Sequence, residues 1–242
     1  MTRKTALVLG GSGGIGLAIA HLLAEEGFRL TIQGRRDETV AAALDQLNSD
    51  AGEPPLGMSA DLADEAQVRQ VVAAHEERWG RLDILVNSAG VGIGQNLEEI
   101  RAKTFDLQVA INLRAAVLAT RDCLPLLEQA GAEHGKALIV HVSSWAGKHP
   151  PAWLSVYGAS KAALISFAAS SQKELAGKGI QVTALCPATV ETEMTTYAQG
   201  EIPAEEMIRP LDIAEAVRFL LRTSPNCVIP EIVIGRTGDL SG

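Results

Sequence analysis

The chain has 242 residues, of which 47% are hydrophobic and 21% are charged, and its formal net charge is −8. This length supports one large core and is too short for two ordinary domains. The acidic balance, with no basic cluster larger than the Arg35–Arg36 pair, argues against nucleic acid and anionic membranes as partners. The three cysteines lie far apart, the five histidines form no ligand pair, and no apolar run is long enough to cross a membrane. We therefore expect a cytoplasmic protein without a catalytic metal.

Short apolar segments, many of them β-branched, alternate with longer helical segments along the chain. In chain order, we predict strands at 5–10, 29–34, 56–59, 82–87, 136–144, 180–186 and 227–235. The helices are predicted at 15–26, 37–48, 65–79, 98–129, 156–177 and 212–222. This alternation predicts an α/β fold with a doubly wound parallel sheet of about seven strands and helices on both faces. The polar segment 188–210 follows a strand end and is predicted to be a flexible substrate loop.

A glycine-rich turn, "LVLGGSGGIG", links the first predicted strand to the first predicted helix. Gly11, Gly13 and Gly16 fit the pattern G-x-G-x-x-G, and Gly10, Gly14 and Gly16 fit G-x-x-x-G-x-G. Glycines let the backbone approach a pyrophosphate closely, and the helix N-terminus offers N–H groups and a positive dipole end. The alternative is a tight turn without a ligand. The strand before and the helix after it favour a dinucleotide site.

The second predicted strand ends in "QGRRDE", and this ending bears on the choice of cofactor. Folds that bind NAD usually place an acid at the strand end for the ribose hydroxyls, whereas an arginine there suits a 2′-phosphate. Here Gly34 is followed by Arg35 and Arg36, and a guanidinium can bind phosphate through paired hydrogen bonds. The pattern favours NADP(H) over NAD(H). The alternative is that the arginines are ordinary surface residues.

The segment "SVYGASK" places Tyr157 and Lys161 four residues apart, on one face of a predicted helix. A free phenol has a pKa of about 10, so it is a poor base at neutral pH. An ammonium at 4 Å and an effective dielectric of 20 would attract the phenolate by roughly 4 kcal/mol before desolvation. Such a tyrosine can exchange a proton with a carbonyl oxygen. The alternative is a surface pair, which the serines Ser143 and Ser144 at the preceding strand end argue against.

Several spaced motifs together carry a resemblance to a known family. They are GGSGGIG (10–16), ADL (60–62), NSAG (87–90), INL (111–113), VSS (142–144), YGASK (157–161) and CPATVET (186–192). With these motifs the chain resembles the classical short-chain dehydrogenase/reductase family over nearly its whole length. The resemblance implies a single-domain Rossmann-type fold over 1–242, with one NAD(P)-binding site.

The resemblance also implies a role for each matched catalytic position. Tyr157 would be the general acid/base, and Lys161 would lower its pKa and bond the nicotinamide ribose. Ser144 would orient the substrate oxygen, and Asn112 would hold a water that links Lys161 to solvent. The cofactor-binding residues implied are Gly10, Ser12, Gly13, Gly14, Ile15, Gly16, Arg35, Arg36, Asp61, Leu62, Asn87, Ala89, Gly90, Tyr157, Lys161, Pro187, Val190 and Thr192.

The chain departs from the family pattern at a few positions. Leu9 stands where the family usually has threonine, so we expect a structural hydrogen bond near the glycine loop to be lost. Ser88 replaces the second asparagine of the NNAG segment, and Ala188 replaces a glycine after Pro187. The C-terminus lacks the frequent glycine-rich ending, which puts the usual tetramer contact in doubt. None of the four catalytic positions departs.

Large apolar side chains around these positions suggest the walls of a substrate pocket. The predicted substrate-binding residues are Ser144, Trp145, Trp153, Tyr157, Ala188 and Met194. Plain packing is the alternative for each apolar one. Only Lys148 and His149 offer nearby positive charge, so a neutral or mainly apolar carbonyl or alcohol is expected.

The leading hypothesis is an NADPH-dependent oxidoreductase that reversibly reduces a carbonyl to an alcohol. An epimerase or dehydratase with bound NAD(P) is an alternative, although such relatives usually carry a longer C-terminal substrate domain. A non-catalytic NADP-binding sensor is a third reading, but it would have little need for the four catalytic residues together. In the family, the helices at 104–129 and 156–177 pair across a two-fold axis, so the resemblance implies a homodimer or homotetramer.

Overall fold

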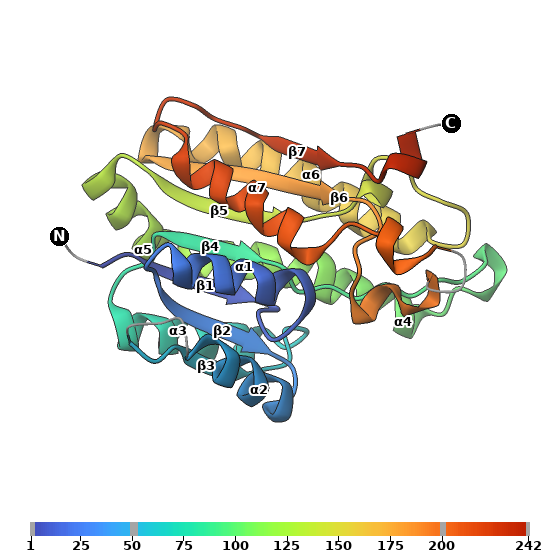
Figure 1. The fold of residues 1–242 in the computed structure, drawn as a ribbon, viewed down its shortest axis with the longest axis horizontal. Helices are drawn as coiled ribbons and strands as arrows, with labels where there is room; N and C mark the ends of the chain where they lie inside the picture. Colours follow the sequence, from blue (N-terminus) through green and yellow to red (C-terminus); the bar gives the residue numbers. More distant parts are fainter. Residues whose placement is uncertain (1–2, 49–52, 199–201, 241–242) are drawn as a thin grey trace.

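The computed structural model describes residues 3–48, 53–198 and 202–240. Seven strands form one sheet in the order β3-β2-β1-β4-β5-β6-β7, and all neighbours pair in parallel (Figure 1). They are β1 (Thr5–Leu9), β2 (Arg29–Gly34), β3 (Leu56–Ser59), β4 (Ile84–Asn87), β5 (Ala137–Val142), β6 (Ile180–Pro187) and β7 (Glu231–Ile234). The sheet confirms the predicted doubly wound architecture. The strand order reverses between β1 and β4, which is where such sheets bind ligands at their carboxyl ends.

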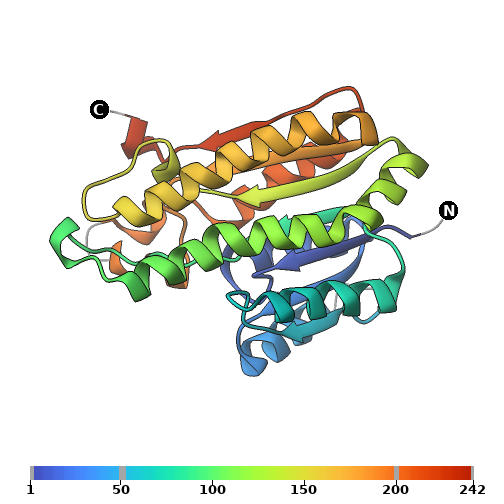
Figure 2. The same cartoon turned by 180° about the vertical axis from the view of Figure 1, so that it is seen from behind.

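Helices cover both faces of the sheet, as the sequence predicts. The helices α1 (Gly14–Glu25), α2 (Asp37–Leu47) and α7 (Pro210–Arg222) lie on the face seen in Figure 1. The helices α3 (Glu65–Trp79), α5 (Ala115–His134) and α6 (Ser155–Leu175) cover the opposite face, seen in Figure 2. Each face therefore encloses its own apolar layer. No helix in the described ranges is long and apolar enough to cross a membrane.

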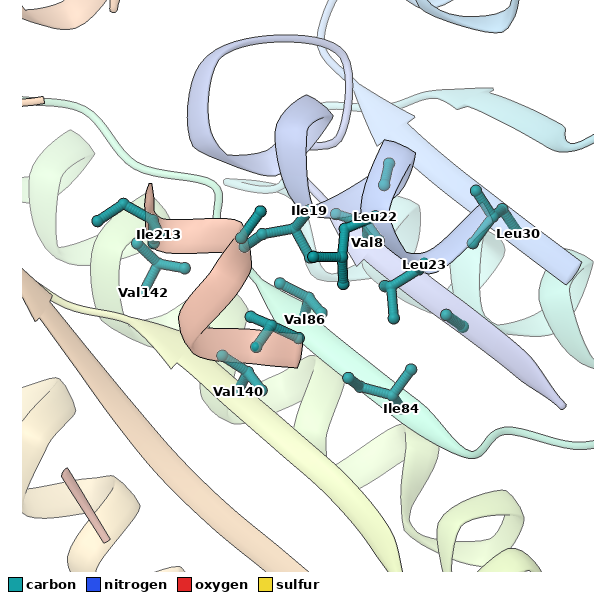
Figure 3. Packing of buried hydrophobic residues seen from close by; sticks show 14 of the residues in the cluster. Val8, Ile19, Leu22, Leu23, Leu30, Ile84, Val86, Val140, Val142 and Ile213 are labelled. Carbon is teal, nitrogen blue, oxygen red and sulfur yellow. The ribbon is translucent and has the colours of Figure 1, made fainter. Parts of the chain in front are cut away.

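Alternation along each strand divides the side chains between the two layers. Val8, Val86 and Val140 point from three neighbouring strands toward α1 and α7, where they meet Ile19 and Ile213 (Figure 3). The intervening strand residues, including Leu7, Leu85 and Ile139, pack under α3, α5 and α6. Strands buried on both faces explain why the sequence shows continuous apolar runs instead of alternation.

Four predicted strands are shorter in the structure, and those expected at 5–10 and 136–144 cover only Thr5–Leu9 and Ala137–Val142. The strand expected at 82–87 begins at Ile84; just before it, the Asp83 carboxylate accepts the Thr5 N–H, and the Asp83 N–H donates to the Thr5 carbonyl at 3.0 Å. The strand expected at 227–235 is limited to Glu231–Ile234, since Pro230 has no N–H to give to a ladder.

The helix expected at 98–129 is divided into several pieces. A 3-10 turn (Leu97–Glu99) precedes α4 (Ala102–Val109), and a π-helical turn (Ala110–Arg114) then connects α4 to α5. Turns of this kind contain one extra residue and often lie at functional sites. Asn112, one of the predicted catalytic residues, lies inside this π turn.

The predicted substrate loop 188–210 contains some local structure. It has 3-10 turns at Glu193–Ala198 and Ala204–Glu206, and Val190 pairs with Ile208 in a parallel bridge. Helix α7 begins at Pro210, two residues earlier than predicted, because proline suits the first helical position and Asp212 accepts from the Arg209 N–H at 3.0 Å. Residues 199–201 of the predicted loop lie outside the described residues.

Candidate active site

The predicted site residues come together at the carboxyl ends of the central strands. Gly10 follows β1, Asn87 ends β4, and Ser144 follows β5. Tyr157 and Lys161 lie in the first turns of α6, which packs against β5 and β6. Residues that are far apart in the sequence are thus adjacent because parallel strands end at the same edge of the sheet.

The glycine loop between β1 and α1 has a backbone that other residues could not adopt. Gly10 has a φ of +75°, and a Cβ there would lie 2.6 Å from the backbone N of Ala89. A Cβ on Gly16 would collide with the carbonyl of Gly10. Gly13 caps α1 without a side-chain hydrogen bond, so the first N–H groups of the helix are left for an anion. The loop has the shape of a phosphate cradle.

The segment after β6 approaches this loop from the other side. A Cβ on Gly14 would lie 3.1 Å from the Thr192 methyl, so Thr192 and the loop are in close proximity. Val190 is 2% exposed and belongs to the core under α1 and α7, together with half-buried Ile15. Ala188 packs against the same core, and its N–H donates to the Ile234 carbonyl at 2.8 Å.

At the end of β2, Gly34 makes room for Ser12 of the glycine loop. A Cβ on Gly34 would lie 2.6 Å from the Cβ of Ser12, so an acidic side chain at position 34 would displace that serine. Arg35 and Arg36 are exposed, and neither forms an ion pair with a carboxylate in the described parts of the chain.

The adenine-side segment that follows β3 is held by its own turn. Asp61 is exposed, and its Oδ1 accepts from the N–H of Ala63 at 2.9 Å. Leu62 is buried at 4% exposure under the face covered by α3 and α5. Gln67 from α3 accepts the N–H of Asp61 at 2.8 Å. The Asp61 carboxylate therefore stabilises the turn by a hydrogen bond to Ala63, and the Leu62 side chain packs in the core.

Lys161 is the most buried charged group of the site, at 3% exposure. Its Nζ donates to the carbonyl of Val142 at 2.9 Å and lies 5.8 Å from the ring centroid of Tyr157. Burial lowers the pKa of Lys161 to about 8, so the amine is mainly cationic at neutral pH. The predicted shared face of Tyr157 and Lys161 is present in α6.

Asn112 connects the π turn to the segment after β4 and to helix α6. Its Oδ1 accepts from the Val91 N–H at 2.8 Å, and its Nδ2 donates to the Val91 carbonyl and to the Ser160 hydroxyl, both at 3.0 Å. The Ser160 hydroxyl donates in turn to the carbonyl of Tyr157 at 2.7 Å. A Cβ on Gly90 would lie 3.3 Å from Lys161 Nζ and 3.4 Å from Asn112 Oδ1. The predicted residues Gly90, Asn112 and Lys161 thus converge.

The two adjacent serines after β5 have different roles. Ser143 is buried, and its hydroxyl donates to the carbonyl of Lys161 at 2.8 Å, which fastens α6 to the strand end. Ser144 is half-buried, and its Oγ accepts from the N–H of Ala146 at 3.1 Å. Ser144 therefore also caps a short 3-10 turn.

The predicted substrate-side residues are brought together only in part. A Cβ on Gly92 would lie 3.8 Å from both the Met194 sulfur and the Tyr157 ring, so these two side chains converge there. Trp153 has a φ of +61° and lies across Gly94, and its carbonyl accepts from the Gln95 N–H at 2.7 Å. Trp145 stacks on His149 with ring centroids 4.5 Å apart.

Two features escaped the sequence analysis, although both are polar residues within apolar strands. Gln33 in β2 accepts the N–H of Gly10, the residue after Leu9, on its Oε1 at 3.1 Å. His141 in β5 lies 3.2 Å from the Asn87 amide (Nδ1 to Nδ2) and contacts Phe167 edge-on. In each case a polar residue within a buried strand could have indicated a specific hydrogen bond, because a buried polar group needs a partner.

Acid should destabilise the protein through two buried histidines. Burial lowers the pKa of His75 to about 4 and of His141 to about 3, below the value of about 6.5 in an unfolded chain. The unfolded chain therefore takes up protons first, and stability present above pH 6.5 is lost as the pH falls toward 4. At pH 5 each histidine should lower the free energy of unfolding by about 2 kcal/mol relative to pH 7.

Urea unfolding at pH 7 and pH 5 measures this effect. His75→Gln and His141→Asn should each reduce the difference between the two pH values by about 2 kcal/mol. The exposed His149→Gln serves as control. An unchanged difference in either buried variant would contradict the assignment for that residue.

Comparisons with known proteins agree with the geometry. The family model described as short chain dehydrogenase matches residues 4–202. An oxidoreductase of Sarocladium schorii is 36% identical over 231 residues, covering 91% of this chain and 89% of that protein. The crystal structure of a 3-ketoacyl-(acyl-carrier-protein) reductase from Brucella melitensis, complexed with NADH, is 30% identical with a TM-score of 0.87, and 96% of each chain is covered.

A variant of actinorhodin polyketide ketoreductase, solved with NADPH, is 29% identical with a TM-score of 0.88, and 99% of this chain and 98% of that chain are covered. These neighbours support a nicotinamide cofactor, and they include both the phosphorylated and the unphosphorylated form. The matched motifs, the sheet and the crevice residues lead to one conclusion: the chain belongs to the short-chain dehydrogenase family and is an oxidoreductase.

Proposed function

We propose that the protein is an NADPH-dependent oxidoreductase that reversibly reduces a neutral, mainly apolar carbonyl compound to an alcohol. The observation that carries this proposal is the pairing of the buried Lys161 ammonium with the Tyr157 ring, 5.8 Å away, beside the glycine loop. A buried cation beside a tyrosine is an arrangement suited to proton transfer, and the loop is suited to a dinucleotide.

The residues present fit such a cofactor. Gly10 and Gly16 leave space that a Cβ would fill, and the first turn of α1 can receive a pyrophosphate. When bound, NADPH supplies a hydride to the carbonyl carbon. In this proposal Arg35 would bind the 2′-phosphate, and Lys161 would bind the nicotinamide ribose.

The proton is supplied by the chain itself. The Tyr157 hydroxyl would donate its proton to the carbonyl oxygen during reduction and recover one during oxidation. The Lys161 cation favours the deprotonated tyrosine that results, because opposite charges attract strongly in a partly buried site. Ser144 would hold the substrate oxygen by a hydrogen bond. Asn112, bonded to Val91 and Ser160, fixes the segments on both sides of the lysine.

The apolar character of the substrate is inferred from the side chains around Tyr157. Met194 is 43% exposed and Trp153 is 45% exposed, although both are large and apolar. Apart from Lys161, the cation that the sequence places near these side chains is Lys148, which forms an ion pair with Glu231 at 2.7 Å and is therefore not available to a carboxylate or phosphate. These features favour a neutral carbonyl with an apolar body.

The first test is fluorescence titration of the purified protein with NADPH and NADH, followed by NADPH oxidation with a panel of aldehydes and ketones. Tighter binding of NADPH and turnover of apolar carbonyls are expected. Binding without turnover across the panel would favour the non-catalytic sensor. Tighter binding of NADH would refute the cofactor assignment.

Cofactor preference should depend on Arg35. Removing a hydrogen bond to a charged group costs about 1.5–3 kcal/mol, so Arg35→Ala should weaken NADPH binding about 10- to 100-fold. NADH binding should change little, because NADH has no 2′-phosphate. Arg222→Ala, an exposed arginine at the end of α7, is the matched control. If Arg35→Ala weakened NADPH and NADH binding equally, Arg35 would not be the residue that binds the 2′-phosphate.

A further inference from the structure

Gln33 is a buried amide in β2, and it is 2% exposed. Its Nε2 donates to the carbonyl of Gly34 and to the carbonyl of Ala60, both at 2.7 Å. Its Oε1 accepts from the N–H of Gly10 at 3.1 Å. Both donors and the acceptor of the side chain are therefore used, which offsets the cost of burying the amide.

The three partners of Gln33 belong to three different parts of the nucleotide site. Gly10 begins the glycine loop, Ala60 directly precedes the adenine-side segment, and Gly34 directly precedes Arg35. The backbone adds to this connection, because the Gly11 N–H donates to the carbonyl of Gln33 at 2.8 Å. One residue thus bonds to the loop, to the arginine segment and to the adenine-side segment.

The Gly10 N–H and the Ala60 carbonyl need partners because they lie where the sheet ladder stops, whereas the Gly34 carbonyl already accepts the Ala60 N–H at 3.0 Å. β1 ends at Leu9, and the positive φ of Gly10 turns the chain away from the neighbouring strand. β3 ends at Ser59, so Ala60 is already outside the strand. Buried backbone groups without a partner are costly. The Gln33 amide satisfies them while leaving the loop in its left-handed turn.

We propose that Gln33 is a positioning residue of the nucleotide site: it sets the glycine loop and the adenine-side segment relative to each other and so determines affinity for the adenosine half of the cofactor. This inference rests on the proposed NADPH site. Gln33 touches neither the reacting atoms nor Tyr157, so its effect should fall on nucleotide binding and not on the chemical step.

Gln33→Met tests the proposal, because methionine has nearly the same length and no amide. We expect the Kd of adenosine 2′,5′-bisphosphate and the KM for NADPH to rise tenfold or more. The kcat at saturating NADPH should stay within threefold of wild type. This separation of KM from kcat is not expected from a general loss of stability, provided that binding is measured well below the melting temperature.

Gln181→Met is the matched control. Gln181 is another buried glutamine on a strand, 6% exposed, and its Nε2 donates to the Pro225 carbonyl at 2.8 Å, away from the glycine loop. It should lower the melting temperature without changing nucleotide affinity. If Gln33→Met unfolds, Gln33→Glu keeps the length and the acceptor for Gly10 but loses both donors. Its loss of affinity should shrink as the pH falls, because a protonated carboxyl regains one donor.

The outcomes separate this inference from the proposed function. If the wild type binds NADPH and the Gln33 variants bind both nucleotides within twofold of it, Gln33 is only structural and the inference is wrong. If the wild type binds neither NADPH nor adenosine 2′,5′-bisphosphate, the proposed function itself fails. A tenfold loss in both Gln33→Met and Gln33→Glu, absent in Gln181→Met, supports the inference.

Discussion

Replacing Tyr157 by phenylalanine should lower kcat by about 10²- to 10⁴-fold, the usual contribution of general acid–base catalysis. The substitution removes only the hydroxyl, and the remaining ring can still pack beside Gly92. NADPH binding should therefore change by less than about threefold, since Lys161 and the glycine loop are untouched. Single-turnover measurement of NADPH oxidation, together with fluorescence titration, gives both quantities.

Ser170→Ala is a suitable control for this experiment, because it removes an exposed hydroxyl from the same helix, α6. It should leave kcat and binding unchanged. A wild-type rate in Tyr157→Phe would mean that another group supplies the proton. Loss of binding together with rate would instead mean that the tyrosine is needed to form the nucleotide site.

A second large effect is expected far from the active site, where a buried ion pair joins the strand beginnings. Arg81 and Asp83 are 6% and 4% exposed and form two hydrogen bonds of 2.7 Å, which raise the pKa of Arg81 above its usual range. Asp83 also accepts the Thr5 N–H at 2.9 Å. Breaking such a buried pair from one side typically costs about 3–5 kcal/mol.

Asp83→Asn should therefore lower the free energy of unfolding by about 3 kcal/mol, as measured by urea denaturation at pH 7. The isosteric amide would place a donor against the guanidinium and leave that charge buried and only partly compensated. Glu65→Gln is the matched control, since Glu65 pairs with Arg121 at the exposed surface, where such pairs contribute at most about 1 kcal/mol. If the two variants lost equal free energy of unfolding, burial would not be the reason for the effect of Asp83→Asn.

Much of the fold could be predicted because its pattern is local and repeated. Every predicted strand exists, and the glycine loop, Ser144, Tyr157 and Lys161 lie together because parallel strands end at one edge. The sequence could not reveal the ends of strands that tertiary contacts decide, such as the start of β4 after Asp83. A strand boundary depends on partners that are distant in sequence.

The roles of individual polar residues were harder to predict for a related reason. Ser143 and Ser144 are adjacent and chemically identical, yet strand alternation buries the first against Lys161 and leaves the second half-exposed. Gln33 escaped notice because two of its partners, Gly10 and Ala60, come from distant segments, and no spacing in the sequence connects them to it. Trp153 lies so close to Gly94, distant in sequence, that a side chain at position 94 would collide with its ring.

The π turn at Ala110–Arg114 sets the rotation of α4 about its axis relative to α5. An α-helix turns about 100° and advances about 1.5 Å per residue. If the same residues were wound as a regular α-helix without this wider turn, α4 would be rotated by about that angle about its axis relative to α5. Asn112 could not then keep its bonds to Val91 and Ser160 while α5 kept its packing in the core. The one extra residue of the π turn therefore lets α4 and α5 each present the face that their different neighbours require.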